Sequence, residues 1–153
     1  MAYEATIQRV AAEPMAAVAA RSTQPMLSKV IPASLDKVWA FLRDDDFGKL
    51  GCNTVYYAPL MRGAEFDLLV GVRVGVPFAP RGEIVVAETP AGDVSHVVYF
   101  GDYSGMHPAH KAAQDAAAAH GRKLTGASWE VYGDWFDDWS KVRTDIFYQL
   151  EPQ

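Results

Sequence analysis

The sequence contains almost no cysteine and no long hydrophobic run. Cys52 is the only thiol, so no disulfide can form within the chain, which suits a reducing cytoplasm. The first ten residues lack the basic segment and apolar run of a signal peptide. The best apolar stretch is interrupted by Arg73 and is far shorter than a membrane span. We therefore expect a cytoplasmic protein with no membrane partner.

Basic residues are also scarce. Lys and Arg total 14 against 19 Asp and Glu, which gives a net charge of −5. This charge repels phosphate backbones and anionic lipids. We therefore expect no direct nucleic-acid partner and favour a cationic one, while any protein partner stays unknown.

Length and composition indicate an ordinary globular domain. The 153 residues are 50% hydrophobic and 22% charged. A chain of this length can bury about 70% of its unfolded surface, so it needs no metal or disulfide to fold. We expect one domain over residues 1–153, with no cofactor.

Two helices are expected among seven strands. Leu35, Val38, Trp39 and Leu42 form one apolar helical stripe, and Pro32 suits the first turn of that helix. The second helix spans about 108–120, is rich in alanine and ends before Gly121. An alanine face can lie very close to a sheet or leave room for large groups opposite. The expected strands cover residues 6–22 with a bend at Pro14, 54–58, 66–74 after a turn at Gly63, 82–89, 94–103, 127–133 and 144–151.

The order of these elements repeats strand-helix-strand-strand twice, with an extra strand between the repeats. Neither half has enough helix to cover its own sheet. The pattern therefore predicts an α+β fold in which duplicated modules pair into one curved, mainly antiparallel sheet. We expect both helices on one face of the sheet and a ligand cleft on the other.

Glu130 is the strongest candidate for a functional side chain. In a strand, Glu130 and Tyr132 point to one face, and Trp129 and Val131 point to the other. If Trp129 and Val131 pack under the helices, Glu130 and Tyr132 face the cleft. The alternative is that Glu130 is a solvent-facing strand residue.

Aromatic residues surround this position in the expected sheet. Either Phe147, or the set of Ile146, Tyr148 and Leu150, lies beside Glu130. A buried carboxylate is costly unless a cation compensates it, and aromatic faces attract cations by about 0.5–2 kcal/mol each. The expected ligand-binding residues are Glu130, Tyr132, Tyr148, Phe147, Tyr56, Tyr99 and Trp39.

Four segments together resemble one known family. They are DLLVGVRV at 67–74, VVYFGDY at 97–103, WEVYGD at 129–134 and RTDIFYQL at 143–150. In this order they resemble the gyrase-inhibitory-protein-like (GyrI-like) effector-binding domains, which also form the ligand-binding halves of some AraC-type and MerR-type regulators. The segment with Trp129 and Glu130 is the most specific.

The resemblance implies a ligand cleft between two strand-helix-strand-strand modules, with an acidic residue at the position of Glu130 at its base. One departure is Asp145, where the family often has Glu. Another is that a strand is expected within ten residues of Met1, which leaves no room for a helix-turn-helix before it. We therefore expect a stand-alone binding domain that is not itself a DNA-binding regulator.

Other candidates carry weaker signals. His107 and His110 have the i, i+3 spacing of metal ligands, but no second cluster completes a site, so we expect no metal and an exposed first helical turn. His96 is expected on the strand surface, and Cys52 is expected to be an ordinary loop thiol. Trp135 and Trp139 either close over a ligand or pack their own loop down.

Three functions follow from these residues. The first is binding of hydrophobic, planar or cationic small molecules, for sequestration or sensing. The second is an enzyme, a hydrolase that opens the cyclopropane ring of DNA-alkylating natural products, as some GyrI-like proteins do. It would use Glu130 as general base, with Tyr132 or Tyr148 orienting the substrate. The third is inhibition of a nucleic-acid enzyme through the acidic loop 134–138.

Overall fold

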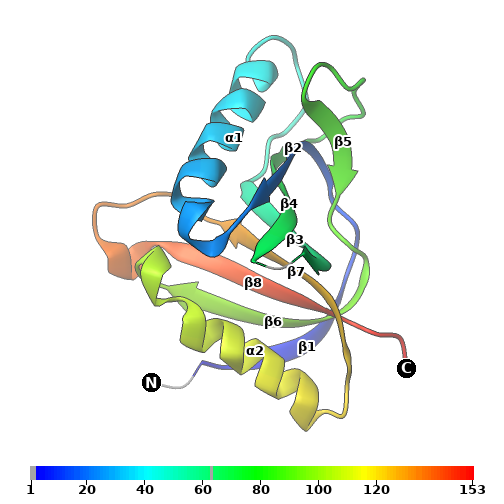
Figure 1. Ribbon diagram of the computed structural model, residues 1–153, viewed down its shortest axis with the longest axis vertical. Helices are drawn as coiled ribbons and strands as arrows, with labels where there is room; N and C mark the ends of the chain where they lie inside the picture. Colours follow the sequence, from blue (N-terminus) through cyan, green and yellow to red (C-terminus); the bar gives the residue numbers. More distant parts are fainter. Residues whose placement is uncertain (1–2, 63) are drawn as a thin grey trace.

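The computed structural model describes residues 3–62 and 64–153. Its strands form one eight-stranded sheet in the order β1-β6-β8-β7-β3-β4-β2-β5, and every neighbouring pair is antiparallel (Figure 1). The elements are β1 (Ala5–Val10), β2 (Pro14–Ser22), α1 (Leu27–Leu42), β3 (Asn53–Arg62), β4 (Glu65–Arg73), β5 (Ile84–Glu88), β6 (Gly92–Phe100), α2 (His107–Ala119), β7 (Leu124–Tyr132) and β8 (Arg143–Leu150).

The sheet consists of two similar halves that meet between β3 and β7. One half is β2-α1-β3-β4 with β5 at its edge, and the other is β6-α2-β7-β8 with β1 at its edge. Counted outward from the seam, the strands of one half are β3, β4, β2 and β5, and the corresponding strands of the other half are β7, β8, β6 and β1. The α+β fold class and its duplicated modules are therefore confirmed.

The strand expected over residues 6–22 is two strands in different halves. β1 pairs with β6, whereas β2 lies between β4 and β5. The chain leaves one half and enters the other just before Pro14, which is the first residue of β2. A strand start is one of the few places where proline fits a sheet, because it has no N–H to donate. The single-strand prediction was wrong.

Helix α1 is longer than its apolar stripe. It begins at Leu27, so Pro32 lies inside the helix and the prediction of a first-turn proline was wrong. A three-residue 3₁₀ turn with Pro25 immediately precedes the helix. Helix α2 agrees with its prediction, since Gly121 follows it with a φ of +65°. The turn expected at Gly63 lies outside the described residues.

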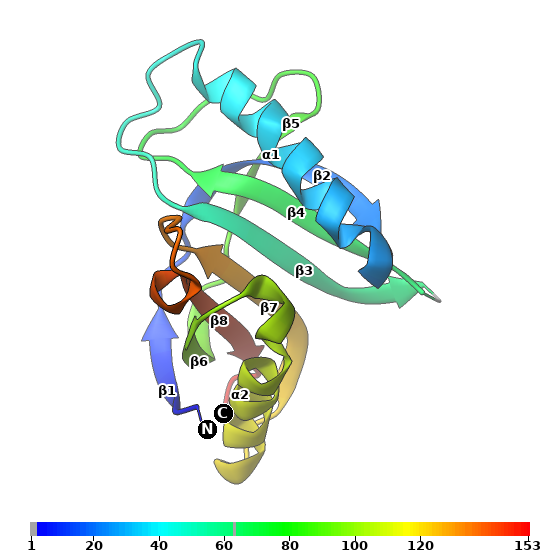
Figure 2. The same ribbon diagram turned by 90° about the vertical axis from the view of Figure 1, so that its left-hand side faces the viewer.

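Both helices pack on the same face of the sheet, as expected. The strand pairing on this face gives one cross-strand row of direct neighbours: Val70, Val55, Glu130, Ile146 and Val97. The valines of β3 and β4 belong to the core near α1, and Val97 and Ile146 belong to the core under α2. Each helix covers the outer strands of its own half, which leaves β3 and β7 between them (Figures 1 and 2).

The uncovered seam places the cleft on the helical face, so the expectation of a cleft on the opposite face was wrong. The residues opposite the helices form a separate row in which Tyr56, Trp129, Phe147 and His96 are neighbours. Trp129 is buried in this row, stacked on Phe147 with ring centroids 5.2 Å apart. Trp129 therefore packs on the face away from the helices, contrary to expectation.

Candidate functional site

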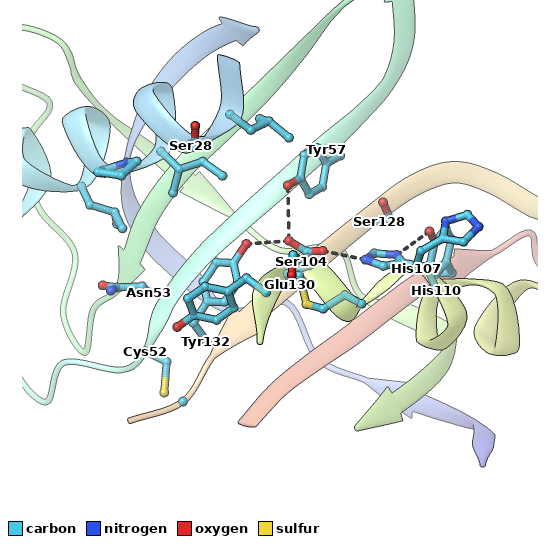
Figure 3. A pocket seen from close by; sticks show the side chains of 18 of the residues that line it. Ser28, Cys52, Asn53, Tyr57, Ser104, His107, His110, Ser128, Glu130 and Tyr132 are labelled. Carbon is cyan, nitrogen blue, oxygen red and sulfur yellow. Dashed lines mark hydrogen bonds and ion pairs between the residues drawn. The ribbon is translucent and has the colours of Figure 1, made fainter. Parts of the chain in front are cut away.

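A cleft of about 1920 Å³ opens between the two helices, with β3 and β7 as its floor. Its apolar side includes Leu27, Ile31 and Leu35 of α1, and its opposite side includes His107 and His110 of α2. Figure 3 shows Tyr57 and Glu130 between these two walls. The seam between the halves is thus the base of this cleft.

Glu130 lies at the base of the cleft and is only 4% exposed. Tyr132 donates to its Oε1 at 2.5 Å, and Tyr57 donates to the same oxygen at 3.3 Å (Figure 3). The other oxygen, Oε2, lies 2.6 Å from Nε2 of His110. Within the described residues, no lysine or arginine reaches this carboxylate within 4.0 Å. Hydrogen bonds and one imidazole therefore compensate it in place of a permanent positive charge.

His110 connects Glu130 to a second polar group. Its Nδ1 lies 2.7 Å from the hydroxyl of Tyr148, and Gln114 donates to that hydroxyl at 3.1 Å. The imidazole is half-buried against the edge of Tyr148. The expectation of an exposed first-turn histidine was wrong for His110, although His107 is exposed. The sequence offered one overlooked signal: His110 and Gln114 form an i, i+4 polar pair beside the alanine face of α2.

The tyrosines around Glu130 are held in their neutral form. Burial raises the pKa of Tyr57 and Tyr132 well above the ordinary value, and the charge of Glu130 raises both further. Burial also raises the pKa of Tyr148. Their hydroxyls therefore stay available as hydrogen-bond donors at every physiological pH.

Four of the expected ligand-binding residues line the cleft together. Glu130 and Tyr132 lie on its floor, Tyr148 comes from the adjoining strand β8, and Trp39 comes from α1. The indole of Trp39 donates to Oδ1 of Asn53 at 2.9 Å, which fixes one ring edge at the wall. Of the two alternatives for β8, the set containing Tyr148 is the one on the face of Glu130.

Phe147, Tyr56 and Tyr99 do not line the cleft, so their assignment to it was wrong. Phe147 and Tyr56 lie on the opposite face, since they are neighbours of Trp129 in its row. Tyr57 is the tyrosine of β3 that faces Glu130. Tyr99 is on the helical face but is buried under α2, where its hydroxyl donates to the carbonyl of Asp102.

An aromatic group extends from the floor of the cleft to its rim. Tyr132 meets Tyr103 edge to face, Tyr103 meets Trp139 in the same way, and Trp139 meets Trp135. Trp135 lines the cleft and is 59% exposed. The loop is therefore packed on itself through Trp139, while Trp135 leaves an indole surface free at the mouth.

A smaller cavity of about 460 Å³ lies on the other face, beside Trp129 and Phe147. His96 stacks on Phe147 there and bonds Asp145 at 2.8 Å, so it is more enclosed than a surface strand residue. Burial alone would raise the pKa of Asp145, but hydrogen bonds from His96 and Arg143 lower it to about 2. Asp145 thus takes part in this ion-pair group, on the face of the sheet opposite to Glu130.

Metal ligands do not gather in the described residues, where no group of three His, Cys, Asp or Glu side chains could hold an ion. Cys52 is exposed and lies at the edge of both cavities. Neither described helix combines the length and apolar character needed to cross a membrane.

The sequence matches no family profile, and no curated protein matches it. Solved structures do match. The C-terminal domain of EcmrR is 18% identical, with a TM-score of 0.79 over 99% of both chains. SAV2435, solved bound to tetraphenylphosphonium, is 13% identical, with a TM-score of 0.65 over 97% of this chain and 94% of that one. A hydrolase from Listeria innocua is 6% identical, with a TM-score of 0.63 over 97% and 92%.

This chain has the GyrI-like fold. At such low identities the likeness concerns the fold, and it confirms the fold that the four sequence segments implied. In this GyrI-like fold the cleft lies at the seam of the two halves, where each half supplies one helix and one floor strand.

Proposed function

We propose that this chain binds lipophilic cations with aromatic groups in the cleft, with Glu130 as the counter-charge. The observation that carries the proposal is the carboxylate itself, which is 4% exposed and lies in a row of aliphatic side chains. A carboxylate in such surroundings is stabilised by any positive charge that reaches it without bringing water.

The walls of the cleft suit an aromatic guest. Trp39 offers a ring surface from one wall, Tyr57 from the floor and Trp135 from the rim, and α1 supplies apolar contact through Leu27, Ile31 and Leu35. Ring faces attract cations and stack on planar groups without demanding one shape. The binding of tetraphenylphosphonium by SAV2435, which shares this fold, supports the same class of ligand here.

The first test is a calorimetric titration with tetraphenylphosphonium at neutral pH. Glu130→Gln keeps the shape of the side chain and removes its charge. We expect it to weaken binding by about 1–3 kcal/mol, which is roughly 5- to 150-fold in Kd. Wild-type protein should also melt at a higher temperature when the compound is present, because the ligand binds only the folded state.

Glu88→Gln is the matched control, since Glu88 is exposed on the edge strand β5, outside the cleft. It should bind as the wild type does. Equal affinity of the wild type and Glu130→Gln would remove Glu130 from the binding mechanism. Failure of the wild type to bind tetraphenylphosphonium would contradict the proposal that the cleft binds lipophilic aromatic cations. The hydrolase and the nucleic-acid enzyme inhibitor stay predictions of the sequence.

A further inference from the structure

His110 is the one basic side chain within ion-pair distance of Glu130 in the described part of the molecule. The two groups come from different elements, α2 and β7, and their nearest atoms are 2.6 Å apart. A carboxylate always accepts, so Nε2 of His110 carries a hydrogen and donates it to Oε2. The other ring nitrogen, Nδ1, decides the charge of the imidazole.

Both charge states of His110 keep both hydrogen bonds of the ring. In the imidazolium, Nδ1–H donates to the hydroxyl oxygen of Tyr148. In the neutral ring, the Tyr148 hydroxyl turns and donates to Nδ1, at the same 2.7 Å separation. Gln114 donates to the hydroxyl oxygen in either case. The site can therefore lose or gain one proton without breaking a contact.

The other ionisable groups near His110 do not compensate Glu130. Tyr148 on β8, Tyr99 on β6 and Tyr3 before β1 face α2, and all three are ordinarily neutral phenols. On α2 itself, Lys111 bonds Asp115 at 2.8 Å, and both are exposed. His107 is exposed at the cleft wall. Across the cleft, Tyr57 and Tyr132 donate to Glu130 as neutral hydroxyls.

We propose that His110 is an internal counter-ion that a cationic ligand replaces, so that binding of the ligand releases one proton from Nδ1 to solvent. This inference rests on the proposed function. Without ligand, imidazolium and carboxylate form a neutral pair at the base of the cleft. A cation that enters beside them leaves two positive charges next to one buried carboxylate. Loss of the Nδ1 proton restores neutrality, and the hydroxyl of Tyr148 turns to donate to the ring.

The exchange has a defined pH signature. In the pH range where the ligand-free ring is protonated and the ligand-bound ring is neutral, each unit of falling pH should weaken cation binding by about tenfold. Above the range, affinity should be independent of pH. A neutral guest of similar size, such as triphenylphosphine oxide, should bind without releasing a proton.

The test is calorimetry of the whole chain with tetraphenylphosphonium at about pH 6, in two buffers of different ionisation enthalpy. We expect the wild type to release close to one proton per ligand, and His110→Gln to release none and to lose the tenfold slope. His120→Gln is the control, because His120 is exposed at the end of the same helix and its imidazole bonds the carbonyl of Ala116, away from Glu130. It should behave as the wild type does.

A second measurement does not depend on any variant that must fold. In wild-type protein near pH 6, the ring carbon signal of His110 should shift from the imidazolium to the neutral position as the ligand is added. Ligand binding with no proton release, or a pH slope that persists in His110→Gln, overturns the exchange and leaves the proposed function standing. A wild type that binds neither compound overturns the proposed function itself.

Discussion

Glu130 is a charged side chain in a row of valine and isoleucine. Its neighbours in that row, Val55 and Ile146, are fully buried. A carboxylate at a position that suits an aliphatic side chain lowers stability by several kcal/mol unless the carboxylate is hydrogen-bonded. The donors Tyr57, Tyr132 and His110 reduce this cost in the ligand-free protein, and the proposed cation would reduce it further.

Tyr57 and Tyr56 allow a direct test of this compensation. Tyr57→Phe removes one donor from a buried carboxylate, so it should lower the free energy of unfolding by about 1–2 kcal/mol in urea denaturation at neutral pH. Tyr56→Phe changes the opposite face, where its hydroxyl has no hydrogen bond among the described residues. It should stay within about 0.5 kcal/mol of the wild type. An equal loss of unfolding free energy in the two variants would contradict the assignment of Tyr57 to the cleft face of β3 and of Tyr56 to the opposite face.

The sequence was sufficient to predict that Glu130 and Tyr132 share a face, because alternation within one strand needs only a period of two. Choosing between Tyr56 and Tyr57 required the pairing of β3 with β7, which sequence alone does not define. A shift of one residue in that register exchanges the two faces of the strand. The same limit explains why the sequence left open whether Phe147 or the set with Tyr148 lies beside Glu130.

At the scale of elements, the alanines of α2 let the helix lie against β6. Ala109, Ala113 and Ala117 are buried, and the hydroxyl of Ser95 donates to the carbonyl of Ala113 at 2.7 Å. Of the two readings of the alanine face, close packing on the sheet is the one observed. This close approach brings His110, on the neighbouring side of the helix, within reach of β7 and β8.

Enlarging a buried alanine tests this packing. Ala113→Leu should lower the free energy of unfolding by about 1–3 kcal/mol, because a close-packed interface has no room for the added methyl groups. Ala118→Leu, at an exposed position of the same helix, should change it by less than about 0.5 kcal/mol. Denaturant titration of both variants gives the comparison. An Ala113→Leu variant with an unchanged free energy of unfolding would contradict this close packing of α2 on the sheet.

At the scale of the whole molecule, duplication creates the cleft. Each half covers its own outer strands with one helix, and the two uncovered floor strands, β3 and β7, pair at the seam. The repeated order of elements predicted the two halves and their antiparallel sheet. It did not define the side on which the hollow would open, because that depends on how far each short helix extends across its own half.

The most direct measurement of the central claim compares two ions of one shape and opposite charge in sodium buffer. The wild type should bind tetraphenylphosphonium at least about tenfold more tightly than tetraphenylborate, because the buried carboxylate attracts one and repels the other. Glu130→Gln should bring the two affinities much closer together. A wild type that binds both ions equally, or a preference that survives Glu130→Gln, would contradict the account.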